Sequence, residues 1–442
     1  MHGLRVHRAG AWPAPFAIPL VADPLSAVLL VTTALLGTLV VIYSHAAVDR
    51  RRKALGYYPV LQVQLLGTCG ALLSGDLFNL FVWFEVMLVA SLVLLVLGGE
   101  RAQLEGAMKY VTMNLLASLL LLTGIGLVYG LTGTLNLGAL SSAMREVPAG
   151  TALATAMVFL VALGIKAGAF PLFSWLPAAY PAPPVAVGAL FSGLLTKIAV
   201  YALVRLFTVV FTHDAGAVRP LILFGAGLTM VAGVLGAMVQ MDVRRLLAFH
   251  VVSQIGYLLM GLGIGTPLAL LGAVFFMVHI MLAKSALFLV SGITYALRGT
   301  YQLDLMGGIA KDHPGVAVLF LLPALSMAGL PPLSGFFAKF TLVRAGLEAG
   351  AYAIVAVAVA VSLLTLYSMI KVWTLAFWGV APVTVIRRAR PAIGLVAPTA
   401  ALAVLMLGIG LAAGPLLEFA GRASDALLAT AQYAEAVAGN TR

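Results

Sequence analysis

Long apolar segments run through almost the entire chain and constrain its fold more than any other feature. Of its 442 residues, 62% are hydrophobic and 9% are charged, whereas a soluble domain carries roughly 25% charged residues. A helix that crosses a membrane needs about 20 apolar residues, and a span with its connection takes roughly 35, so about a dozen spans fit this length. The sequence therefore predicts an all-α polytopic membrane protein and excludes a water-soluble enzyme.

Hydropathy, together with glycine and proline positions, divides the chain into twelve expected spans. They are 22–44, 57–75, 77–97, 106–130, 151–177, 184–211, 218–240, 246–264, 267–296, 314–343, 352–378 and 391–417. An even number of spans places both termini on the same side of the membrane.

Basic residues in alternating loops indicate which side that is. One side collects Arg50, Arg51, Arg52, Lys53, Arg101, Arg244, Arg245, Arg298, Lys311, Arg387, Arg388 and Arg390. The other side has fewer: Arg5, Arg8, Arg145, Arg219, Arg344, Arg422 and Arg442. Because cytoplasmic loops carry the excess of Lys and Arg, both termini are expected outside a prokaryotic cell membrane.

Proline interrupts two of the expected spans. Pro171 lies within GIKAGAFPLFSWLP, and Pro331 and Pro332 lie within SMAGLPPLSGFFAKF. Proline removes a backbone donor and clashes with the preceding turn, so both helices should break inside the membrane. The freed backbone groups can exist at that depth only beside protein or a water-filled cavity.

The two interrupted segments also resemble each other. KAGAFPLFS, which begins at Lys166, aligns with MAGLPPLSG, which begins at Met327, an offset of 327 − 166 = 161 residues. Each lies in the fourth span of a five-span block, 57–211 or 218–378, flanked by 1–56 and 379–442. An odd number of spans inverts the second block relative to the first, the arrangement in which paired broken helices mark an ion site. Chance similarity between glycine- and proline-rich helices is the alternative.

Titratable residues inside the spans are the candidate functional groups. They are Glu85, Lys166, Lys197, His250, His279, Lys284 and Lys339. A charge at a helix centre costs about 2.5–3.5 kcal/mol, so these groups should face one another, backbone carbonyls or water and not lipid. Amines and imidazoles that change charge can take up and release protons. The set therefore predicts a proton relay in which Glu85 pairs with Lys166.

Each of these residues also has a structural interpretation. The Glu85–Lys166 pair could be a static ion pair, and Lys197 or Lys284 could satisfy exposed carbonyls. His250 and His279 could be hydrogen-bonded core residues.

Other charged residues predict anchoring or capping. Lys109, Arg205 and Lys371 lie towards span ends and should extend to the headgroups. Asp76 and Asp242 precede spans and are typical helix N-caps. The only cysteine is Cys69, and no metal-ligand spacing, phosphate loop, dinucleotide fingerprint or nucleophilic triad is present. We expect neither a cofactor nor binding of nucleic acid.

Several ordered motifs carry a family resemblance. They are DLFNLFVWFEVML, GIKAGAFPLFSWLPAAYPAPP, LFSGLLTKIAVYALVR, HVVSQIGYLL and AGLPPLSGFFAKF. From about Trp12 to Leu417 the chain resembles the antiporter-like membrane subunits shared by Mrp cation/proton antiporters and respiratory complex I. AWPAPFAIPLVADPLSA near the start favours the branch of Mrp D subunits.

The resemblance implies a role for each candidate. Glu85 matches the family's first-repeat glutamate, Lys166 its broken-helix lysine and Lys197 the next lysine of the relay. The central positions match His250, His279 and Lys284. Lys339 matches the residue of the second broken helix, which is glutamate in some complex I relatives. Such subunits move protons along a hydrated mid-membrane axis within a multisubunit assembly, in exchange for sodium in the Mrp case.

The chain departs from the family at its beginning, because relatives usually have fourteen core spans and this sequence starts just before the third. A misassigned start codon or a truncation would explain the difference. Both five-span blocks remain, so the relay is expected to be intact.

Four functions fit these features to different degrees. The leading one is a proton-translocating subunit of an Na⁺/H⁺ antiporter in the cell membrane, with other membrane subunits as partners. The same subunit could instead serve a complex I-type oxidoreductase or a membrane-bound hydrogenase. A structural scaffold would tolerate neutral residues at Glu85 and Lys339. An intramembrane enzyme acting on lipid is disfavoured, because the sequence has no acidic metal cluster.

Overall fold

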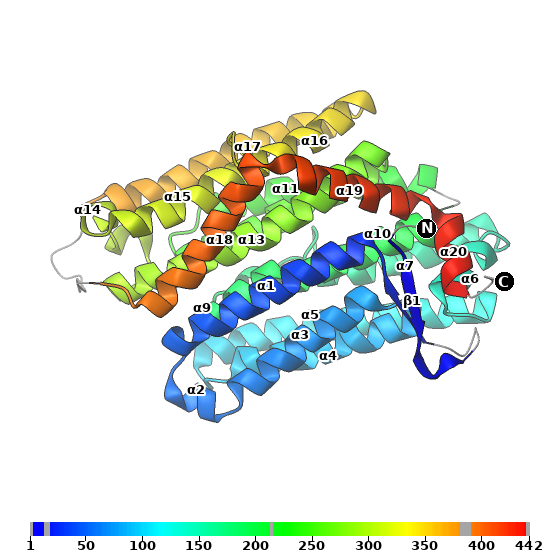
Figure 1. The fold of residues 1–442 in the computed structure, drawn as a ribbon, viewed down its shortest axis with the longest axis horizontal. Helices are drawn as coiled ribbons and strands as arrows, with labels where there is room; N and C mark the ends of the chain where they lie inside the picture. The colour runs from blue at the N-terminus through cyan, green and yellow to red at the C-terminus, as the bar shows by residue number, and fades with distance from the viewer. Residues whose placement is uncertain (1–2, 13–17, 213–214, 381–389, 439–442) are drawn as a thin grey trace.

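The computed structural model describes residues 3–12, 18–212, 215–380 and 390–438, which form a bundle of long helices (Figure 1). Arg387, Arg388 and Arg442, three of the basic residues that bear on orientation, lie outside the described residues.

The helices of the first half are α1 (Pro24–Ala47), α2 (Arg50–Ala54), α3 (Tyr57–Leu73), α4 (Leu77–Val96), α5 (Arg101–Thr132), α6 (Leu137–Ala143), α7 (Ala149–Ala167), α8 (Trp175–Ala179), α9 (Val185–Gly193) and α10 (Leu195–Val209). Those of the second half are α11 (Ala215–Met238), α12 (Val243–Ile264), α13 (Pro267–Arg298), α14 (Ile309–Asp312), α15 (Pro314–Ala328), α16 (Ser334–Glu348), α17 (Tyr352–Val372), α18 (Ile393–Leu411), α19 (Ala413–Leu428) and α20 (Thr430–Ala438). Short 3₁₀ turns cover Ala9–Ala11 and Leu303–Leu305, and a π-helical turn covers Trp373–Trp378.

The all-α membrane fold is confirmed. Among the described residues, ten helices are long and apolar enough to cross a membrane. The two expected spans outside that set are 57–75, where α3 has 17 residues, and 314–343, which is divided into α15 and α16. The difference from twelve therefore comes from one short helix and one broken one.

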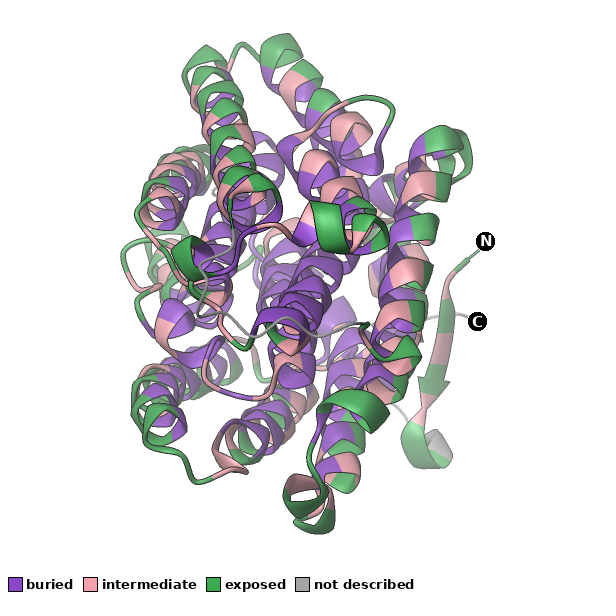
Figure 2. Ribbon diagram, turned by 90° about the vertical axis from the view of Figure 1, so that its left-hand side faces the viewer, coloured by how far each residue is buried: buried purple, intermediate pink, exposed green. Residues whose placement is uncertain are grey.

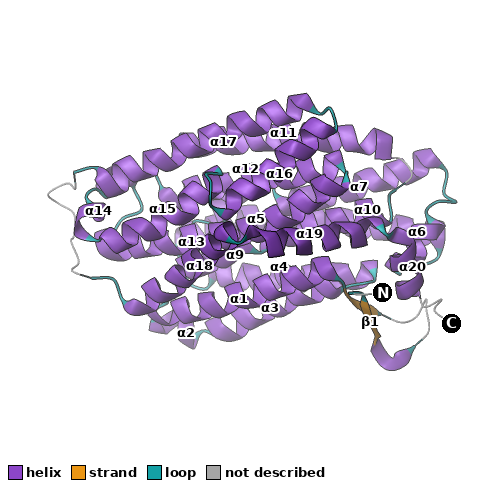
Figure 3. Cartoon of the chain, turned by 45° about the horizontal axis from the view of Figure 1, so that its top comes forward, coloured by secondary structure: helices purple, strands orange, loops and turns teal. Residues whose placement is uncertain are grey.

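A small hairpin was not expected from the sequence. Strands β1 (Arg5–Arg8) and β2 (Pro19–Ala22) pair antiparallel at one end of the bundle, with Arg5 opposite Ala22 (Figure 3). Asp23 follows β2 directly and caps α1, since its side chain accepts a hydrogen bond from the Ser26 N–H at 2.8 Å. The hairpin thus fixes the start of α1.

Four helices form the centre of the bundle. The apolar windows of α9–α10 and α13 are completely buried and that of α12 is 94% buried, whereas the other spanning windows are 39–44% buried. Figure 2 shows this buried centre inside a ring of helices with exposed outer faces. A helix that is apolar on all sides must be surrounded, which explains the central position. The central helices carry four of the seven candidates: Lys197, His250, His279 and Lys284.

Both proline-containing segments are broken as the sequence predicts. Helix α7 ends at Ala167 before Phe170–Pro171, and α15 ends at Ala328 before Pro331–Pro332. Gly168 (φ 76°) and Gly329 (φ 93°) take the left-handed conformation that closes each helix.

The structure contains a third break, at Leu194, that the sequence did not predict. The backbone there separates α9 from α10 in the middle of the expected span 184–211. No proline marks this site. Gly193 directly precedes it, but an isolated glycine inside an apolar span does not by itself predict a break.

The two halves of the chain repeat several structural details at one offset. Helices α5 and α13 each have 32 residues, and their bounds differ by 267 − 101 = 298 − 132 = 166. The bridges Asp76–Asn136 and Asp242–Gln302 differ by the same 242 − 76 = 302 − 136 = 166. The start of α5 and the end of α13 line one hollow, so these two helices run in opposite directions.

Candidate functional site

A serine on α5 joins the first acid–base pair. Glu85 lies in the middle of α4 and Lys166 in the last turn of α7. The Lys166 Nζ donates to the Ser118 Oγ at 2.9 Å, and the Ser118 hydroxyl donates to the Glu85 Oε1. The direct separation of Lys166 Nζ from Glu85 Oε1 is 3.8 Å. The expected ion pair is present, and Ser118, which sequence reasoning missed, bridges it.

A small cavity adjoins this pair. Its volume is about 20 Å³, and its lining includes Lys166, Asn114, Tyr110, Trp175 and Leu195. That volume can hold one water molecule beside polar groups. The cavity therefore extends from Lys166 towards α10.

Lys197 lies at the break between α9 and α10. The Lys197 N–H bonds to the Leu194 carbonyl at 2.9 Å, and the Lys197 Nζ donates to the Ser192 carbonyl and, at 3.3 Å, to the Thr196 Oγ1. The ammonium group thus binds a carbonyl that the break leaves free of the helix. An irregular helix and a lysine at one point form a fixed, completely buried cationic site.

Helix α13 crosses α9 closely and brings Lys284 towards Lys197. A Cβ added at Gly193 would collide with the Ser285 Oγ, and that hydroxyl donates to the Ala189 carbonyl at 3.0 Å. Lys284 is completely buried and lies within electrostatic range of both Lys197 and Lys339. Three lysines from three helices therefore share one buried region.

Both histidines are buried and pair with serines on neighbouring helices. His250 Nε2 lies 2.9 Å from the Ser368 Oγ, and His279 Nδ1 lies 2.9 Å from the Ser334 Oγ. The other ring nitrogens, His250 Nδ1 and His279 Nε2, have no partner among the described residues. Each ring thus has one fixed nitrogen and one free for another hydrogen bond.

Lys339 closes the series at the second break. Its Nζ donates to the Ser362 Oγ at 2.7 Å and to the Ala328 carbonyl, at the end of α15, at 3.4 Å. The same ammonium lies 4.7 Å from the centre of the Tyr257 ring. Lys339, like Lys197, binds a carbonyl at a helix interruption.

The seven candidates form two groups. Glu85 and Lys166 form one, and Lys197, His250, His279, Lys284 and Lys339 form the other. Within the described residues, no direct polar contact joins Lys166 to Lys197. Between the two groups, the completely buried Tyr180 hydroxyl lies near Thr196, the neighbour of Lys197. This hydroxyl has no hydrogen-bond partner among the described residues.

Sequence reasoning also missed the hydroxyl groups that contact the candidate residues. They are Ser118, Thr196, Ser334, Ser362 and Ser368. Thr196 adjoins Lys197 on α10, and the four serines lie on helices other than those of the lysines and histidines they contact. Serine and threonine are common in apolar helices, so composition gives no sign of which ones make such contacts.

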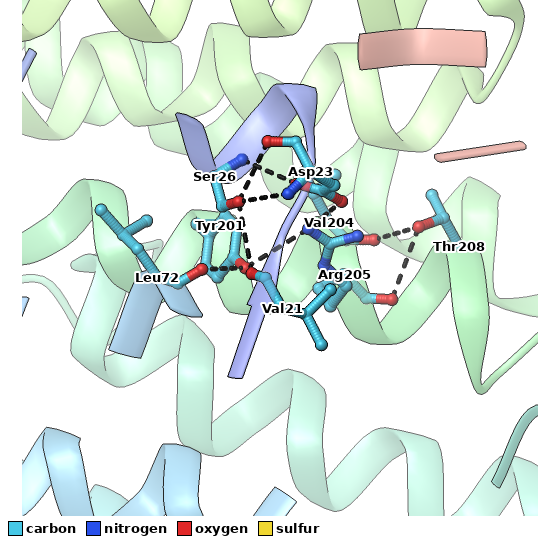
Figure 4. Close-up of polar contacts among 8 residues, drawn as sticks. All are labelled: Val21, Asp23, Ser26, Leu72, Tyr201, Val204, Arg205 and Thr208. Atoms are coloured by element: carbon cyan, nitrogen blue, oxygen red, sulfur yellow. Dashed lines mark hydrogen bonds and ion pairs between the residues drawn. The ribbon is translucent and has the colours of Figure 1, made fainter. Parts of the chain in front are cut away.

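Arg205 corrects one prediction. It does not extend to the headgroups: its side chain is 2% exposed and bonds Asp23, also 2% exposed, at 2.6 Å (Figure 4). The Arg205 guanidinium lies over the rings of Tyr201 and Tyr433. Arg205 is inside the protein because hairpin β1–β2 and helix α20 cover this end of α10. The sequence predicts neither element.

Lys371 is half-buried, and its Nζ binds the carbonyls of Met238, the last residue of α11, and of Gln240 just beyond it, at 2.8 and 2.7 Å. Lys109 is exposed and pairs with Glu105 at 2.9 Å. Asp76 and Asp242 cap α4 and α12 as predicted.

Comparisons with known proteins agree with this architecture. A family model described as NADH:quinone oxidoreductase/Mrp antiporter, TM matches residues 74–365. The chain belongs to this family of membrane subunits. The match contains all seven candidates and both proline breaks.

Curated relatives cover nearly the whole chain. It is 44% identical over 438 residues to the D subunit of the Na(+)/H(+) antiporter of Alkalihalophilus pseudofirmus, covering 99% of this chain and 89% of the relative. It is 39% identical over 436 residues to the protein of the same name in Bacillus subtilis, covering 98% and 88%. The chain is therefore an antiporter-like subunit similar to the Mrp D subunits.

Solved structures share the fold. A chain of the Mrp complex from Dietzia sp. DQ12-45-1b superimposes with a TM-score of 0.92 at 37% identity, over 99% of this chain and 90% of that one. A chain of respiratory complex I from Thermus thermophilus gives 0.83 at 26% identity, over 97% and 90%. Both chains belong to multisubunit membrane complexes, so this fold occurs in contact with other membrane subunits.

Proposed function

We propose that the chain translocates protons as a membrane subunit of a multisubunit Na⁺/H⁺ antiporter. The proposed relay consists of Glu85, Lys166, Lys197, His250, His279, Lys284 and Lys339. The partners are other membrane subunits, and the ions are H⁺ and Na⁺. The similarity to antiporter D subunits at 44% identity supports this assignment.

One observation carries the proposal: buried polar atoms without protein partners surround the relay. Within the described residues they include His250 Nδ1, His279 Nε2, both amide atoms of Gln254 and the Ser253 hydroxyl. A buried polar group without a hydrogen bond costs roughly 1–3 kcal/mol, whereas a bound water satisfies it. Water between these groups would connect their protons.

The first group supports a switch. With Lys166 charged, its ammonium and the Glu85 carboxylate stabilise each other through Ser118. A proton taken up by Glu85 removes that attraction, and Lys166 then releases its proton more readily towards α10. The cavity beside Lys166 lies on that path.

The second group supports onward transfer. Lys197 and Lys339 each hold their ammonium on a carbonyl at a helix interruption. Lys284 lies within electrostatic range of both. Because like charges repel, a proton arriving at one lysine favours release from the next.

Two structural expectations belong to the same proposal. Blocks 57–211 and 218–378 are inverted copies, which the shared 166-residue offset and the opposed directions of α5 and α13 support. We also expect the start of α1 and both termini to face the outside of the cell. The basic residues of α2 and of the start of α12 lie at the opposite end of the bundle, which is the end expected in the cytoplasm.

The test is sodium-dependent proton exchange in sealed vesicles that contain the assembled complex. Lys166→Ala is expected to abolish exchange while assembly, measured by co-purification of the partner subunits, is retained. Lys109→Ala removes an exposed lysine and serves as the control. Full exchange in an assembled Lys166→Ala complex contradicts the proposal.

A redox complex is the second candidate, because the fold is also shared by a chain of complex I. Its proton path would use the same residues. Co-purification distinguishes the two: iron–sulfur or NADH-binding partners favour the redox complex, and membrane subunits alone favour the antiporter.

A further inference from the structure

One face of α10 carries polar side chains from the bundle centre to the end where α1 begins. Lys197, Tyr201 and Arg205 are spaced four residues apart, so they lie above one another about 6 Å apart along the helix. All three are buried. The Tyr201 hydroxyl donates to the Leu72 carbonyl of α3 at 2.8 Å, and the Arg205 Nη2 donates to the Tyr201 hydroxyl at 3.3 Å. The proposed relay does not use Tyr201 or Arg205.

Two unpartnered polar groups lie beside the inner part of this face. The Thr33 Oγ1 of α1 and both amide atoms of Gln64 of α3 have no hydrogen-bond partner among the described residues, and both side chains are completely buried. Leu36, one turn from Thr33 on α1, packs against Gly193 at the end of α9. Leu65, next to Gln64 on α3, packs against Gly37 of α1. Thr33 and Gln64 therefore lie near the α9–α10 break, where α1 and α3 approach the inner end of the face that begins at Lys197.

The outer end of the face reaches an open hollow. Asp23, which pairs with Arg205 at 2.6 Å, lines a pocket of about 370 Å³ together with Arg422, Asp425 and Tyr433. Arg205 Nε and Nη1 are buried without partners among the described residues. Figure 4 shows Arg205 between Asp23 and Tyr201, with Leu72 on the far side of Tyr201. Unpartnered groups thus occur at both ends of the α10 face, and its last ion pair borders the pocket.

We infer that water fills the contact between α1, α3 and α10 and forms a proton path from Lys197 to this pocket. The path rests on the proposed function, because it connects the proposed relay to one membrane surface. In each passage the Lys197 ammonium gives a proton to water and becomes an amine. The excess proton passes along the water beside Gln64 and Thr33 and then Tyr201. It binds the Asp23 carboxylate and leaves from the carboxylic acid to pocket water, which restores the carboxylate; the reverse order carries a proton inward.

The Asp23–Arg205 pair sets the charge of this path. Arg205 stays charged, and the Asp23 carboxylate at 2.6 Å neutralises it. When Asp23 is protonated, the Arg205 charge is briefly unbalanced and favours prompt release of the proton. At rest the pair is therefore neutral, and a proton that binds Asp23 stays there only briefly.

Silver ion accessibility tests the water directly and independently of turnover. Cys69 is the only native cysteine, so Cys69→Ser gives a background in which Thr33→Cys or Gln64→Cys is the single thiol of this chain in the assembled complex. Ala199→Cys is the matched control, because Ala199 is buried on the opposite face of α10. Ag⁺ is added from the pocket side of sealed vesicles, and the remaining free thiol of this chain is counted by maleimide after denaturation. We expect Ag⁺ to block Thr33→Cys and Gln64→Cys at least tenfold faster than Ala199→Cys; equal rates, or faster blocking from the opposite side, overturn the path.

Proton exchange supplies the second measurement. Tyr201→Phe and Gln64→Leu are expected to slow exchange at least tenfold. Tyr57→Phe is the control and keeps the native rate. It removes a buried hydroxyl at the first residue of α3, which pairs with Ser44 of α1. If Lys166→Ala abolishes exchange while both path variants exchange at the native rate and their region excludes Ag⁺, the path is wrong and the proposed function stands. If Lys166→Ala exchanges fully, the proposed function fails, and the proton traffic assigned to the path fails with it.

Discussion

The serine that bridges Glu85 and Lys166 provides the sharpest test of the proposed switch. Ser118→Ala removes the acceptor that lies 2.9 Å from the Lys166 Nζ and the donor to Glu85. The two charges stay 3.8 Å apart, a separation at which their attraction is about 4 kcal/mol at an effective dielectric constant of about 20. The pair therefore persists, but both hydrogen bonds of Ser118 to charged groups are lost. Because the direct attraction between the two charges offsets part of this, we take the net loss as that of one such bond, about 1.5–3 kcal/mol.

That loss corresponds to roughly a tenfold to hundredfold change in an equilibrium. We expect sodium-dependent proton exchange by Ser118→Ala to fall by about this factor, whereas Lys166→Ala should abolish it. The assay is exchange in vesicles, with assembly measured by co-purification. Thr123→Ala is the matched control, since it removes a hydroxyl from the exposed face of the same helix. Native exchange by an assembled Ser118→Ala complex refutes the idea that Ser118 couples the pair.

Further predictions concern the rest of the site and its framework. Ser362→Ala removes the 2.7 Å contact of Lys339 and should slow exchange about tenfold in the vesicle assay; an unchanged rate rejects the role of that contact. Asp23→Asn leaves Arg205 buried without a counter-charge and should cost about 3–5 kcal/mol in thermal unfolding of the purified chain, while adding Arg205→Leu should restore much of it. Equal melting temperatures of the single and double variants contradict this. Gly335→Ala drives a Cβ into the Ser326 carbonyl oxygen and should lower the yield of folded protein, which size-exclusion chromatography measures; a normal yield and melting temperature contradict the close packing of α15 against α16.

The sequence predicts the fold well where a physical signal is local. Long apolar runs predict the spans, and Pro171, Pro331 and Pro332 predict two breaks that the structure contains. Asp76 and Asp242 are recognisable as caps from their positions before apolar runs. In each case the signal and its consequence lie within a few residues.

Features that depend on tertiary contacts are not predictable in this way. The break at Leu194 has no proline, and the serines that pair with His250 and His279 come from other helices. Arg205 is expected at the headgroups because it lies near a span end, yet Asp23, far earlier in the sequence, neutralises it inside the protein. Span position alone cannot reveal a buried partner that the fold brings from elsewhere.

The proposed function requires that the titratable residues share one hydrated region. The most direct measurement is an experimental density map of the assembled complex at a resolution that resolves water. We predict ordered water within hydrogen-bonding distance of His250 Nδ1, His279 Nε2 and the Gln254 amide, continuing from Lys166 to Lys339. Dry packing around these atoms, with their hydrogen bonds taken up by other protein groups, would contradict the proposal.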